Sequence, residues 1–230
     1  MREKLVIIGN STSAKHVYDF VTGYNLFQVV GFAVDAEYRN MDTFCGLPVY
    51  DLGKLDAYFE KKDIKVFVAV LWNRLNADRR SLYERMRENG YQMANLISPH
   101  AVIRGTVKGD NCWLHDYVIV QSEAEIGADC LLMAFTLIGD YSKIGAHCFT
   151  GAKSTIGGKS VVGEQTFIGM NCTVFDDTII GKKCILGACT AVKRNVPDYS
   201  VVKNVSDNST TIQLDDQTIE QKLLFKKNVR

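Results

Sequence analysis

The stretch that decides the fold reads Ile138-Gly139-Asp140-Tyr141-Ser142-Lys143 and then Ile144-Gly145-Ala146-His147-Cys148-Phe149. These two hexads belong to a six-residue rhythm of sixteen consecutive hexads that runs from Val102 to Pro197. The first position is aliphatic in fourteen of them, the exceptions being Lys108 and Thr150, and Gly holds the second position in ten. The fifth position is always Thr, Cys, Val, Ala or Ser. A repeat of this length determines the architecture of its part of the chain.

A period of six fits neither an amphipathic helix, which repeats about every 3.6 residues, nor a simple strand alternation. It fits a short strand followed by a corner, with the aliphatic first residue and the small fifth residue facing an interior. Three such segments form a triangular coil, and successive coils stack as parallel strands about 4.8 Å apart. Because each coil buries its inward side chains only against its neighbours, the stack is a solenoid. We therefore predict a parallel β-helix over residues 98–204.

The cysteines follow the same rhythm. Five of the seven stand at the fifth position, namely Cys112, Cys130, Cys148, Cys172 and Cys184. A free Cys behaves as a small buried hydrophobe, and stacked coils hold neighbouring sulfurs too far apart for an S–S bond of about 2 Å. The chain has no C-x-x-C or H-E-x-x-H spacing, so no metal site is expected. We predict that these cysteines are structural and unpaired, which fits a reducing compartment.

The composition narrows the functional class. The net charge of +1 over 230 residues implies no general attraction to nucleic acid or to a membrane surface. The N-terminal residues show no signal-peptide pattern, and no apolar stretch approaches the length of a membrane span. We expect a cytoplasmic protein of two small domains.

Residues 1–97 lack the hexads and alternate between strand-like and helix-like stretches. We expect strands at Leu5–Ile8, Val29–Val34, Val66–Val70 and Met93–Ile97, and helices at Ala14–Val21, at Leu55–Lys61 and along a face of Leu75, Leu82, Tyr83 and Met86 that ends before Gly90. Such alternation predicts a parallel sheet covered by helices, with ligands at the carboxyl ends of its strands. Those ends are Gly9–Ser13 and Asp35. The domain boundary falls at Ser98-Pro99, and residues 205–230 form a C-terminal extension.

The chain resembles the bacterial sugar acyltransferases of the hexapeptide type, which include sialic-acid O-acetyltransferases and N-acetyltransferases of nucleotide-linked 4-amino sugars. The resemblance covers about residues 4–203. It rests on the hexads, on Ile7-Ile8-Gly9, Ala14-Lys15, Ser98-Pro99 and the closing Val192-Lys193-Arg194-Asn195-Val196-Pro197. It implies a Rossmann-like domain over 1–97 that binds the sugar nucleotide. It also implies a left-handed β-helix over 98–204 that forms a homotrimer, with acetyl-CoA in the groove between neighbouring helices.

The resemblance also implies which residues form the site. Asp140 stands where the family has its catalytic His, and Phe149 stands where it has a second His. The N–H of Gly158, one coil above Asp140, corresponds to the group that supports the thioester carbonyl in the family. Glu123 stacks one coil below Tyr141 and is the natural second carboxylate of the catalytic site, beside Asp140. The implied CoA contacts are Gly158, Gly169, Gly187, Lys193 and Arg194, and the implied substrate contacts are Gly9, Asn10, Ser11, Asp35 and Tyr141.

The role of Asp140 leaves several functions open. A carboxylate has an ordinary pKa near 4 and is a weak base at neutral pH, whereas an amine is a far better nucleophile than a sugar hydroxyl. The leading hypothesis is therefore an acetyl-CoA-dependent N-acyltransferase of a nucleotide-linked amino sugar in lipopolysaccharide or other surface-glycan biosynthesis. The alternatives are a sugar O-acetyltransferase and a non-catalytic trimeric protein that binds a sugar nucleotide, and Asp140 also fits a solvated surface position. We expect His16, His100, His115 and His147 to be surface or packing residues.

Overall fold

The computed structural model describes residues 2–205 and 208–221. The described residues form two compact units. The first comprises the residues up to Leu71 together with Arg79–Leu96, and the second comprises Trp72–Asp78 together with the residues from Ile97 onward. Of the expected extension over 205–230, residues 206–207 and 222–230 lie outside the described residues.

The first unit is built on a mainly parallel sheet. Its strands are β1 (Lys4–Ile8), β2 (Gln28–Val34), β3 (Thr43–Phe44), β4 (Leu47–Asp51), β5 (Ile64–Val68) and β6 (Gln92–Met93), in the spatial order β3-β4-β2-β1-β5-β6. Only β3 runs antiparallel, against β4. Leu5, Val6 and Ile7 of β1 are fully buried, as expected for the apolar strand at the middle of a covered parallel sheet. The short β3–β4 hairpin was not predicted from the sequence.

The helices of the first unit follow the predicted alternation with two differences. The α-helices are α1 (Thr12–Gly23) and α2 (Ala77–Glu88), and the 3-10 helices are η1 (Ala36–Tyr38), η2 (Leu52–Ala57) and η3 (Lys61–Asp63). The helix expected at Leu55–Lys61 is thus replaced by η2 and η3. Leu52 and Leu55 of η2 are buried, and their spacing of three residues suits the 3-10 period. Leu75, expected on the face of α2, lies before that helix.

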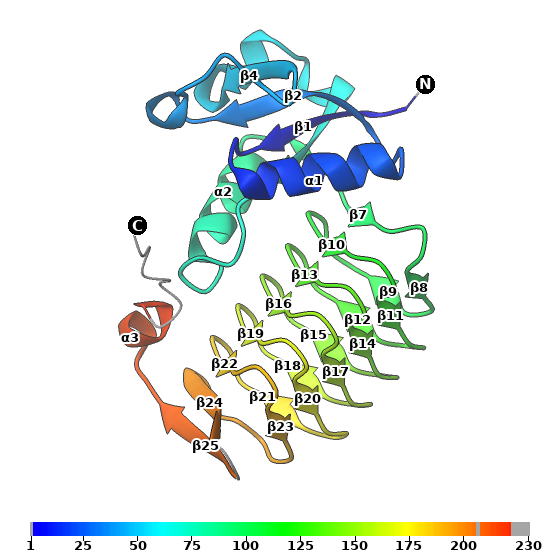
Figure 1. Ribbon diagram of the computed structural model, residues 1–230, viewed down its shortest axis with the longest axis vertical. Helices are drawn as coiled ribbons and strands as arrows, with labels where there is room; N and C mark the ends of the chain where they lie inside the picture. Colours follow the sequence, from blue (N-terminus) through cyan, green and yellow to red (C-terminus); the bar gives the residue numbers. More distant parts are fainter. Residues whose placement is uncertain (1, 206–207, 222–230) are drawn as a thin grey trace. The chain divides into compact units, whose positions relative to one another are not determined.

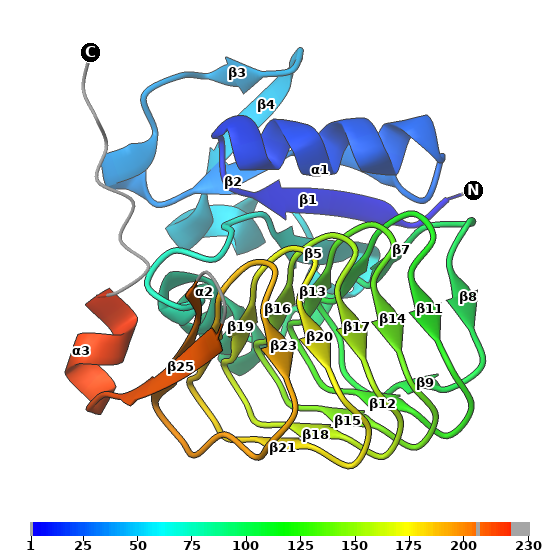
Figure 2. The same ribbon diagram turned by 60° about the horizontal axis from the view of Figure 1, so that its bottom comes forward.

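The second unit is a parallel β-helix whose coils stack one on another (Figure 1, Figure 2). One face, the β10 sheet, contains β7 (Leu96–Ile97), β10 (Trp113–Leu114), β13 (Leu131–Leu132), β16 (Phe149–Thr150), β19 (Phe167–Ile168), β22 (Ile185–Leu186), β24 (Ser200–Val205) and β25 (Asn208–Gln213). A second face, the β11 sheet, contains β8 (Val102–Ile103), β11 (Ile119–Val120), β14 (Leu137–Ile138), β17 (Thr155–Ile156), β20 (Thr173–Val174) and β23 (Ala191–Val192). The third face, the β12 sheet, contains β9 (Thr106–Val107), β12 (Glu125–Ile126), β15 (Lys143–Ile144), β18 (Val161–Val162) and β21 (Ile179–Ile180). The expected fold class, a small α/β sheet followed by a β-helix of hexapeptide repeats, is confirmed.

Each position of the hexad has a physical role. The first-position side chains, such as Ile126 and Ile138, form the fully buried core of the β-helix. A Cβ added to second-position Gly139 would lie 2.6 Å from the main-chain N of Gly158 on the next coil, so the coils stack too closely there for a side chain. From Asn111 to Cys189 the fourth residue of every hexad adopts a left-handed conformation, as Asp129 does with φ 58°.

The fifth position explains the cysteines. Cys112, Cys130, Cys148, Cys172 and Cys184 are buried, and all seven cysteines of the chain are free. Cys130 Sγ donates to the carbonyl oxygen of Gly145 at 3.1 Å, and Ser142 Oγ donates to that of Gly157 at 2.7 Å. The fifth residue is therefore always small enough for the core, and where it is Cys, Ser or Thr it can also donate across the gap between coils. The predicted structural role of these cysteines is confirmed.

The unbroken register expected from Val102 is wrong at both ends of the β-helix. In the first coil Ile103 pairs with Val120 and Val107 pairs with Ile126. Ile103 and Val107, rather than the first-position residues Val102 and Lys108, therefore pack against the core. At the far end Val196 bridges to Ile180, only sixteen residues earlier. A terminal coil has one stacking neighbour instead of two, so a shortened corner there disturbs fewer contacts.

The segment Trp72–Asp78 packs on the β-helix through a left-handed turn. Arg74, Leu75 and Asn76 have φ values of 47°, 55° and 64°. Leu75 is buried in a cluster with Ile185 and Val201. Such a turn is unfavourable for residues with a Cβ, so the burial of Leu75 helps to hold it.

The C-terminal residues close the last coil. Strand β24 continues the β10 sheet in parallel with β22 and pairs in antiparallel with β25. Helix α3 (Asp216–Gln221) follows, and Lys183 Nζ lies 2.7 Å from Asp216 Oδ1. Among the described helices, none combines the length and apolar character that a membrane crossing requires.

Candidate functional site

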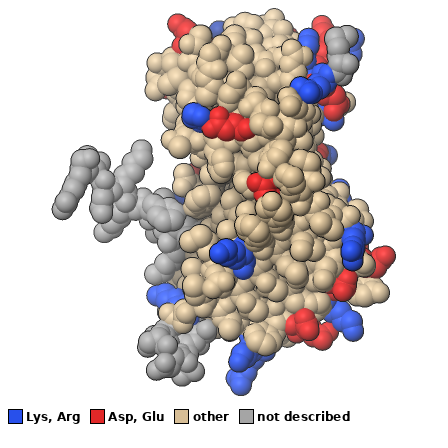
Figure 3. Space-filling model, turned by 45° about the vertical axis from the view of Figure 1, so that its right-hand side comes forward, with Lys and Arg blue, Asp and Glu red and all other residues tan. Residues whose placement is uncertain are grey.

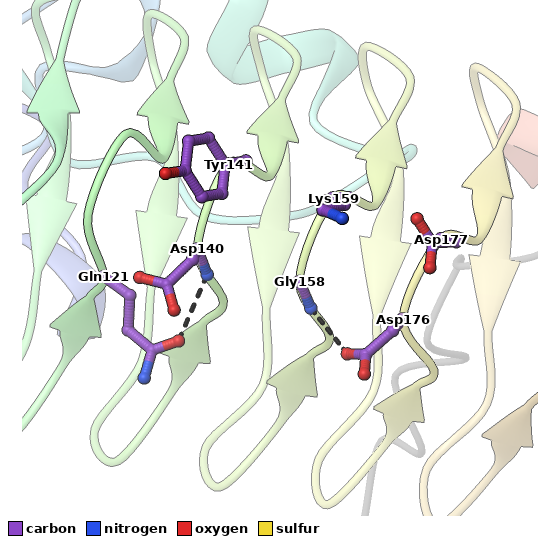
Figure 4. Close-up of a pocket in the computed structure, with 7 residues that line it drawn as sticks. All are labelled: Gln121, Asp140, Tyr141, Gly158, Lys159, Asp176 and Asp177. Atoms are coloured by element: carbon purple, nitrogen blue, oxygen red, sulfur yellow. Dashed lines mark hydrogen bonds between the residues drawn. The ribbon is translucent and has the colours of Figure 1, made fainter.

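The candidate site lies on one column of corners. The first corner follows strands of the β10 sheet, the second corner follows strands of the β11 sheet, and the third follows strands of the β12 sheet. On the second corner of successive coils, the third position of the hexad is occupied by Ser122, Asp140, Gly158, Asp176 and Arg194. Figure 4 shows Asp140, Gly158 and Asp176 on three neighbouring coils. They border a hollow of about 380 Å³ lined by Gln121, Asp140, Tyr141, Gly158, Lys159, Asp176 and Asp177. The structure thus brings together three of the residues predicted for the site, namely Asp140, Tyr141 and Gly158.

The hollow exists because Gly158 interrupts a ladder of side chains. Asp140 Oδ1 accepts a hydrogen bond from the N–H of Ser122, one coil earlier, at 2.9 Å. Asp176 Oδ1 accepts from the N–H of Gly158 in the same way, at 2.7 Å. Gly158 has no side chain to reach back to Asp140, whose N–H donates instead to Gln121 Oε1 at 3.1 Å. The missing side chain leaves the space between Asp140 and Asp176.

Stacking does not force a glycine at position 158. The atom nearest to an added Cβ would be Asp140 O at 3.3 Å, whereas a Cβ on the neighbouring Gly157 would lie 2.4 Å from Asp176 N. A contact of 3.3 Å can relax by a few tenths of an ångström, but one of 2.4 Å with a main-chain atom cannot. Gly157 is therefore needed for packing, and Gly158 keeps the hollow open.

The hollow presents more acidic than basic groups. Asp140, Asp176 and Asp177 contribute three carboxyl groups, and Lys159 contributes the one ammonium group among the lining residues. All four side chains lie on an exposed part of the corner. This balance suits a cationic or hydrogen-bond-donating ligand group better than an anionic one. On the face that Figure 3 shows, acidic and basic side chains are interspersed, and neither sign forms a broad patch.

The other site residues predicted for the β-helix are more widely distributed. Glu123 is exposed on the second corner, but the lining of the hollow includes its neighbour Gln121 instead. Lys193 and Arg194 are exposed on the same corner, two coils beyond Gly158, and Lys193 Nζ lies 5.3 Å from the centre of the Phe175 ring.

Gly169 and Gly187 follow β19 and β22 and therefore lie on the first corner, away from the column of Asp140. A Cβ on Gly169 would lie 2.5 Å from Ala188 N, whereas the nearest atom to a Cβ on Gly187 would be Val202 O at 3.1 Å. Packing thus accounts for Gly169 more fully than for Gly187. Within one chain, the residues predicted to contact CoA occupy two corners rather than one.

His147 takes part in packing on the third corner. The residue is 6% exposed, and its Nδ1 lies 2.9 Å from Asp129 Oδ2. Asp129 Oδ1 also accepts from Asn111 Nδ2 at 2.6 Å, and Asn76 Nδ2 donates to the main-chain oxygen of His147 at 2.6 Å. His147 is thus a packing residue, in line with the expectation that it is a surface or packing residue.

The residues predicted to bind the nucleotide lie at the carboxyl ends of β1 and β2. Gly9 has φ 128°, and Asn10 Nδ2 lies 3.3 Å from Asn40 Oδ1. Ser11 is the N-cap of α1, its side chain makes no capping hydrogen bond, and no acidic residue occupies the first turn. A helix N-terminus with these properties favours an anionic group such as a phosphate. Asp35 Oδ2 accepts from Arg85 Nη2 at 3.0 Å, a partner that was not predicted from the sequence.

Three residues of the site were missed from the sequence. Gln121, Asp176 and Asp177 line the hollow, although Asp176 stands one eighteen-residue coil beyond Gly158. The same stacking arithmetic that paired Asp140 with Gly158 would have found it. Among the described residues, no group of three or more His, Cys, Asp or Glu side chains is arranged to hold a metal ion.

The chain is similar to known proteins both in sequence and in fold. Residues 159–194 match the family described as hexapeptide repeat of succinyl-transferase. The structure is similar to that of a histidine-to-asparagine variant of perosamine N-acetyltransferase from Caulobacter crescentus, in complex with CoA and GDP-perosamine. The two share 25% identity over 90% of this chain and 96% of that chain, with a TM-score of 0.78. The chain is similar to the bacterial sugar acyltransferases of the hexapeptide type. The resemblance inferred from the sequence is confirmed.

Two further solved structures share the fold. The acetyltransferase domain of PglB from Neisseria gonorrhoeae is 18% identical over 91% of this chain and 100% of that chain, with a TM-score of 0.78. WeeI from Acinetobacter baumannii is 20% identical over 90% of this chain and 99% of that chain, with a TM-score of 0.63. No curated protein matches the sequence significantly.

Proposed function

We propose that the protein transfers the acetyl group of acetyl-CoA to the amine of a nucleotide-linked amino sugar. The observation that carries the proposal is that Asp140 and Gly158 border one hollow on the second corner. One of them stands at the position of the catalytic base in similar acyltransferases, and the other at the position of the thioester-binding N–H. The similar perosamine N-acetyltransferase was solved with CoA and GDP-perosamine, which supports this pair of substrates.

The chemistry needs little from the protein beyond positioning. The amine nitrogen attacks the thioester carbonyl carbon, a C–N bond forms, and the C–S bond breaks. The CoA sulfur leaves and is protonated, while the nitrogen loses a proton to Asp140 or to water. Asp140 Oδ1 is held by the Ser122 N–H, so its second oxygen is the one directed to this task. The Gly158 N–H stabilises the negative charge that develops on the carbonyl oxygen.

The acidic lining favours an amine over a hydroxyl as the acceptor. Three carboxyl groups against one ammonium in the hollow attract an amino sugar that arrives protonated, and the ammonium then loses one proton to solvent to give the neutral amine that attacks. A sugar hydroxyl has no charge to gain from them and needs a stronger base than a carboxylate. N-acylation is therefore the preferred reaction, with O-acylation as the alternative.

The sugar nucleotide is assigned to the first unit, where Gly9, Asn10, Ser11 and Asp35 lie at the carboxyl ends of β1 and β2. CoA is assigned to the β-helix, with Gly158, Gly169 and Gly187 along its path and the cations of Lys193 and Arg194 near its phosphates. Tyr141, exposed beside Asp140, is assigned to the acceptor sugar.

The proposal includes a cytoplasmic homotrimer acting in lipopolysaccharide or other surface-glycan biosynthesis. Tyr117 and Phe135 on the first corner are 52% and 54% exposed and stack at 5.0 Å. An exposed aromatic pair of this kind is typical of a contact between subunits. A homotrimer would also bring the first corner of one copy near the second corner of another. In that arrangement, Gly169 and Gly187 of one copy would lie near Asp140 of another copy.

Thiol release tests the proposed reaction. The full chain is incubated with acetyl-CoA and a panel of UDP-, GDP- and dTDP-linked amino sugars, and free CoA is measured. The matched panel carries a hydroxyl in place of the amine. We expect turnover with an amino sugar and at least tenfold less with its hydroxyl counterpart. Faster turnover of the hydroxyl series would favour O-acylation.

One observation favours a second candidate, a protein that binds a sugar nucleotide without catalysis. The Gly158 N–H is already bonded to Asp176, so the acyl oxygen has a competitor. If no sugar nucleotide supports thiol release while one of them still raises the melting temperature, the binding protein is the better description.

A further inference from the structure

The N–H of Gly158 has an acceptor in the structure. Asp176, one coil further along the second corner, places Oδ1 2.7 Å from the Gly158 nitrogen (Figure 4). This distance lies within the range expected between an oxyanion-binding N–H and the charged oxygen that it stabilises. The Asp176 carboxylate therefore occupies the position where the carbonyl oxygen of an acyl thioester would have to lie.

We propose that Asp176 is a displaceable gate of the acyl site, whose carboxylate holds the Gly158 N–H in the free protein and yields it to the carbonyl oxygen of acyl-CoA. The gate rests on the proposed function, because it gives the Gly158 N–H the role assigned to it there. It adds a residue to the acyl site that neither the hexad pattern nor the family resemblance identified.

The two acceptors exclude each other. One N–H points at one position, and a charged carboxylate is a stronger acceptor than a neutral carbonyl oxygen. A carboxylate that stayed beside the reacting carbonyl would also oppose the negative charge that develops there. Acyl transfer through Gly158 therefore requires Asp176 to move. Its side chain lies on the exposed corner, so the carboxylate can turn into solvent without leaving a buried charge behind.

A purely structural role is the competing explanation, and the chain contains a matched case. Asp198 Oδ1 accepts from the N–H of Lys182 at 3.0 Å, which is the same kind of bond between coils on the third corner. The Lys182 N–H borders no part of the hollow. If Asp176 only ties coils together, replacing it should have the same consequences as replacing Asp198.

The gate predicts a ligand-specific effect. It competes with the carbonyl oxygen and with no other part of acyl-CoA. Removing the carboxylate should tighten the binding of acetyl-CoA. It should change the binding of S-ethyl-CoA, a thioether of similar size that lacks the carbonyl oxygen, by a smaller factor. Electrostatic relief for the negatively charged CoA portion would affect both ligands equally, so the difference between them isolates the contact at Gly158.

Isothermal titration of the full chain with acetyl-CoA and with S-ethyl-CoA tests the gate. Asp176→Ala should bind acetyl-CoA about three- to tenfold more tightly than the wild type relative to S-ethyl-CoA, which corresponds to one hydrogen bond. Asp176→Asn, whose neutral oxygen is a weaker competitor, should have an affinity for acetyl-CoA between those of the wild type and Asp176→Ala. Asp198→Ala is the control and should leave both affinities unchanged. Hydrogen exchange at the Gly158 amide should be faster in Asp176→Ala than in the wild type.

The outcomes separate the gate from the proposed function. If Asp176→Ala shifts both affinities by the same factor or neither of them, the gate is wrong and the proposed function stands. If the exchange of the Gly158 amide is unchanged, the gate is wrong as well. If neither the wild type nor any variant binds acetyl-CoA, the proposed function is wrong and the gate falls with it.

Discussion

Cys130 donates a hydrogen bond from its Sγ to the carbonyl oxygen of Gly145 on the next coil, at a distance of 3.1 Å. Ser142 makes the equivalent bond to Gly157 at 2.7 Å. The fifth position of the hexad thus requires a small side chain, and in most hexads that side chain is a donor, so sulfur chemistry is not needed to explain the cysteines. Cysteine, serine and threonine are interchangeable there to the extent that the core tolerates their polarity.

Replacement of Cys130 should separate these two requirements. We expect Cys130→Ser to change the free energy of unfolding by less than about 1 kcal/mol, because the hydroxyl keeps the bond to Gly145. Cys130→Ala should lower it by about 1–2 kcal/mol, because it leaves the part-buried carbonyl of Gly145 without its donor. Urea denaturation followed by circular dichroism measures both. Equal losses for the two variants would show that the bond contributes nothing.

Alkaline pH should destabilise the β-helix. Burial raises the pKa of Cys172 and of Cys184 to about 11, whereas an unfolded thiol ionises near 8.5. Between these values the unfolded chain loses protons that the folded chain keeps, so stability falls as the pH rises from about 8.5 to 11. Below pH 8 the thiols are protonated in both states, and their contribution does not vary.

Denaturation midpoints at pH 8 and pH 10 check this sign. Cys184→Ser removes one of the groups and should make the decrease smaller. The exposed Cys189 provides the control, because Cys189→Ser should leave the decrease unchanged. A midpoint that rises with pH in the wild type would contradict the assignment.

Two adjacent coils supply a matched pair of glycines. Gly139→Ala should lower the free energy of unfolding by about 1–3 kcal/mol, because the new Cβ would meet the Gly158 nitrogen at 2.6 Å. Gly158→Ala should alter it by less than about 1 kcal/mol, since the nearest atom lies at 3.3 Å. The methyl group of Gly158→Ala would nevertheless enter the hollow and weaken acetyl-CoA binding. If both variants were equally unstable, packing between coils would require the glycine at position 158 as it requires Gly139.

Asp140 can be tested without removing its structural bond. An Asn at this position keeps an oxygen for the Ser122 N–H but cannot accept a proton. We expect Asp140→Asn to retain the stability of the wild type and to lower kcat for amino-sugar acetylation by about tenfold to a hundredfold. Asp198→Asn, at the equivalent bond on the third corner, should leave kcat unaffected. Full activity of Asp140→Asn would leave Asp140 with only a structural role.

Leu75 should stabilise the segment that precedes α2. It is 1% exposed and packs with Ile185 and Val201. We expect Leu75→Ala to lower the free energy of unfolding by about 2–4 kcal/mol. Ile212, which is 43% exposed, serves as the control, and Ile212→Ala should change it by less than about 0.5 kcal/mol. A loss below that of the control would mean that the left-handed turn does not depend on Leu75.

The periodic part of the chain could be predicted almost entirely from its sequence. Aliphatic residues such as Ile126, glycines such as Gly139 and small donors such as Cys130 recur because each contacts an equivalent residue one coil away. A repeating pattern of this kind carries its own three-dimensional neighbours. It therefore determined the β-helix, the burial of the cysteines and the place of Asp140 opposite Gly158.

Only the tertiary structure decided the features that do not repeat. The shortened corner that brings Ile103 into the core, the packing of Leu75 against Ile185 and the bond from Gly158 to Asp176 each depend on one local geometry. The periodicity predicts which residues are neighbours, but it does not predict to which of two possible acceptors a main-chain N–H donates. That choice depends on where a particular side chain can reach, and here the carboxylate of Asp176 reaches the N–H of Gly158.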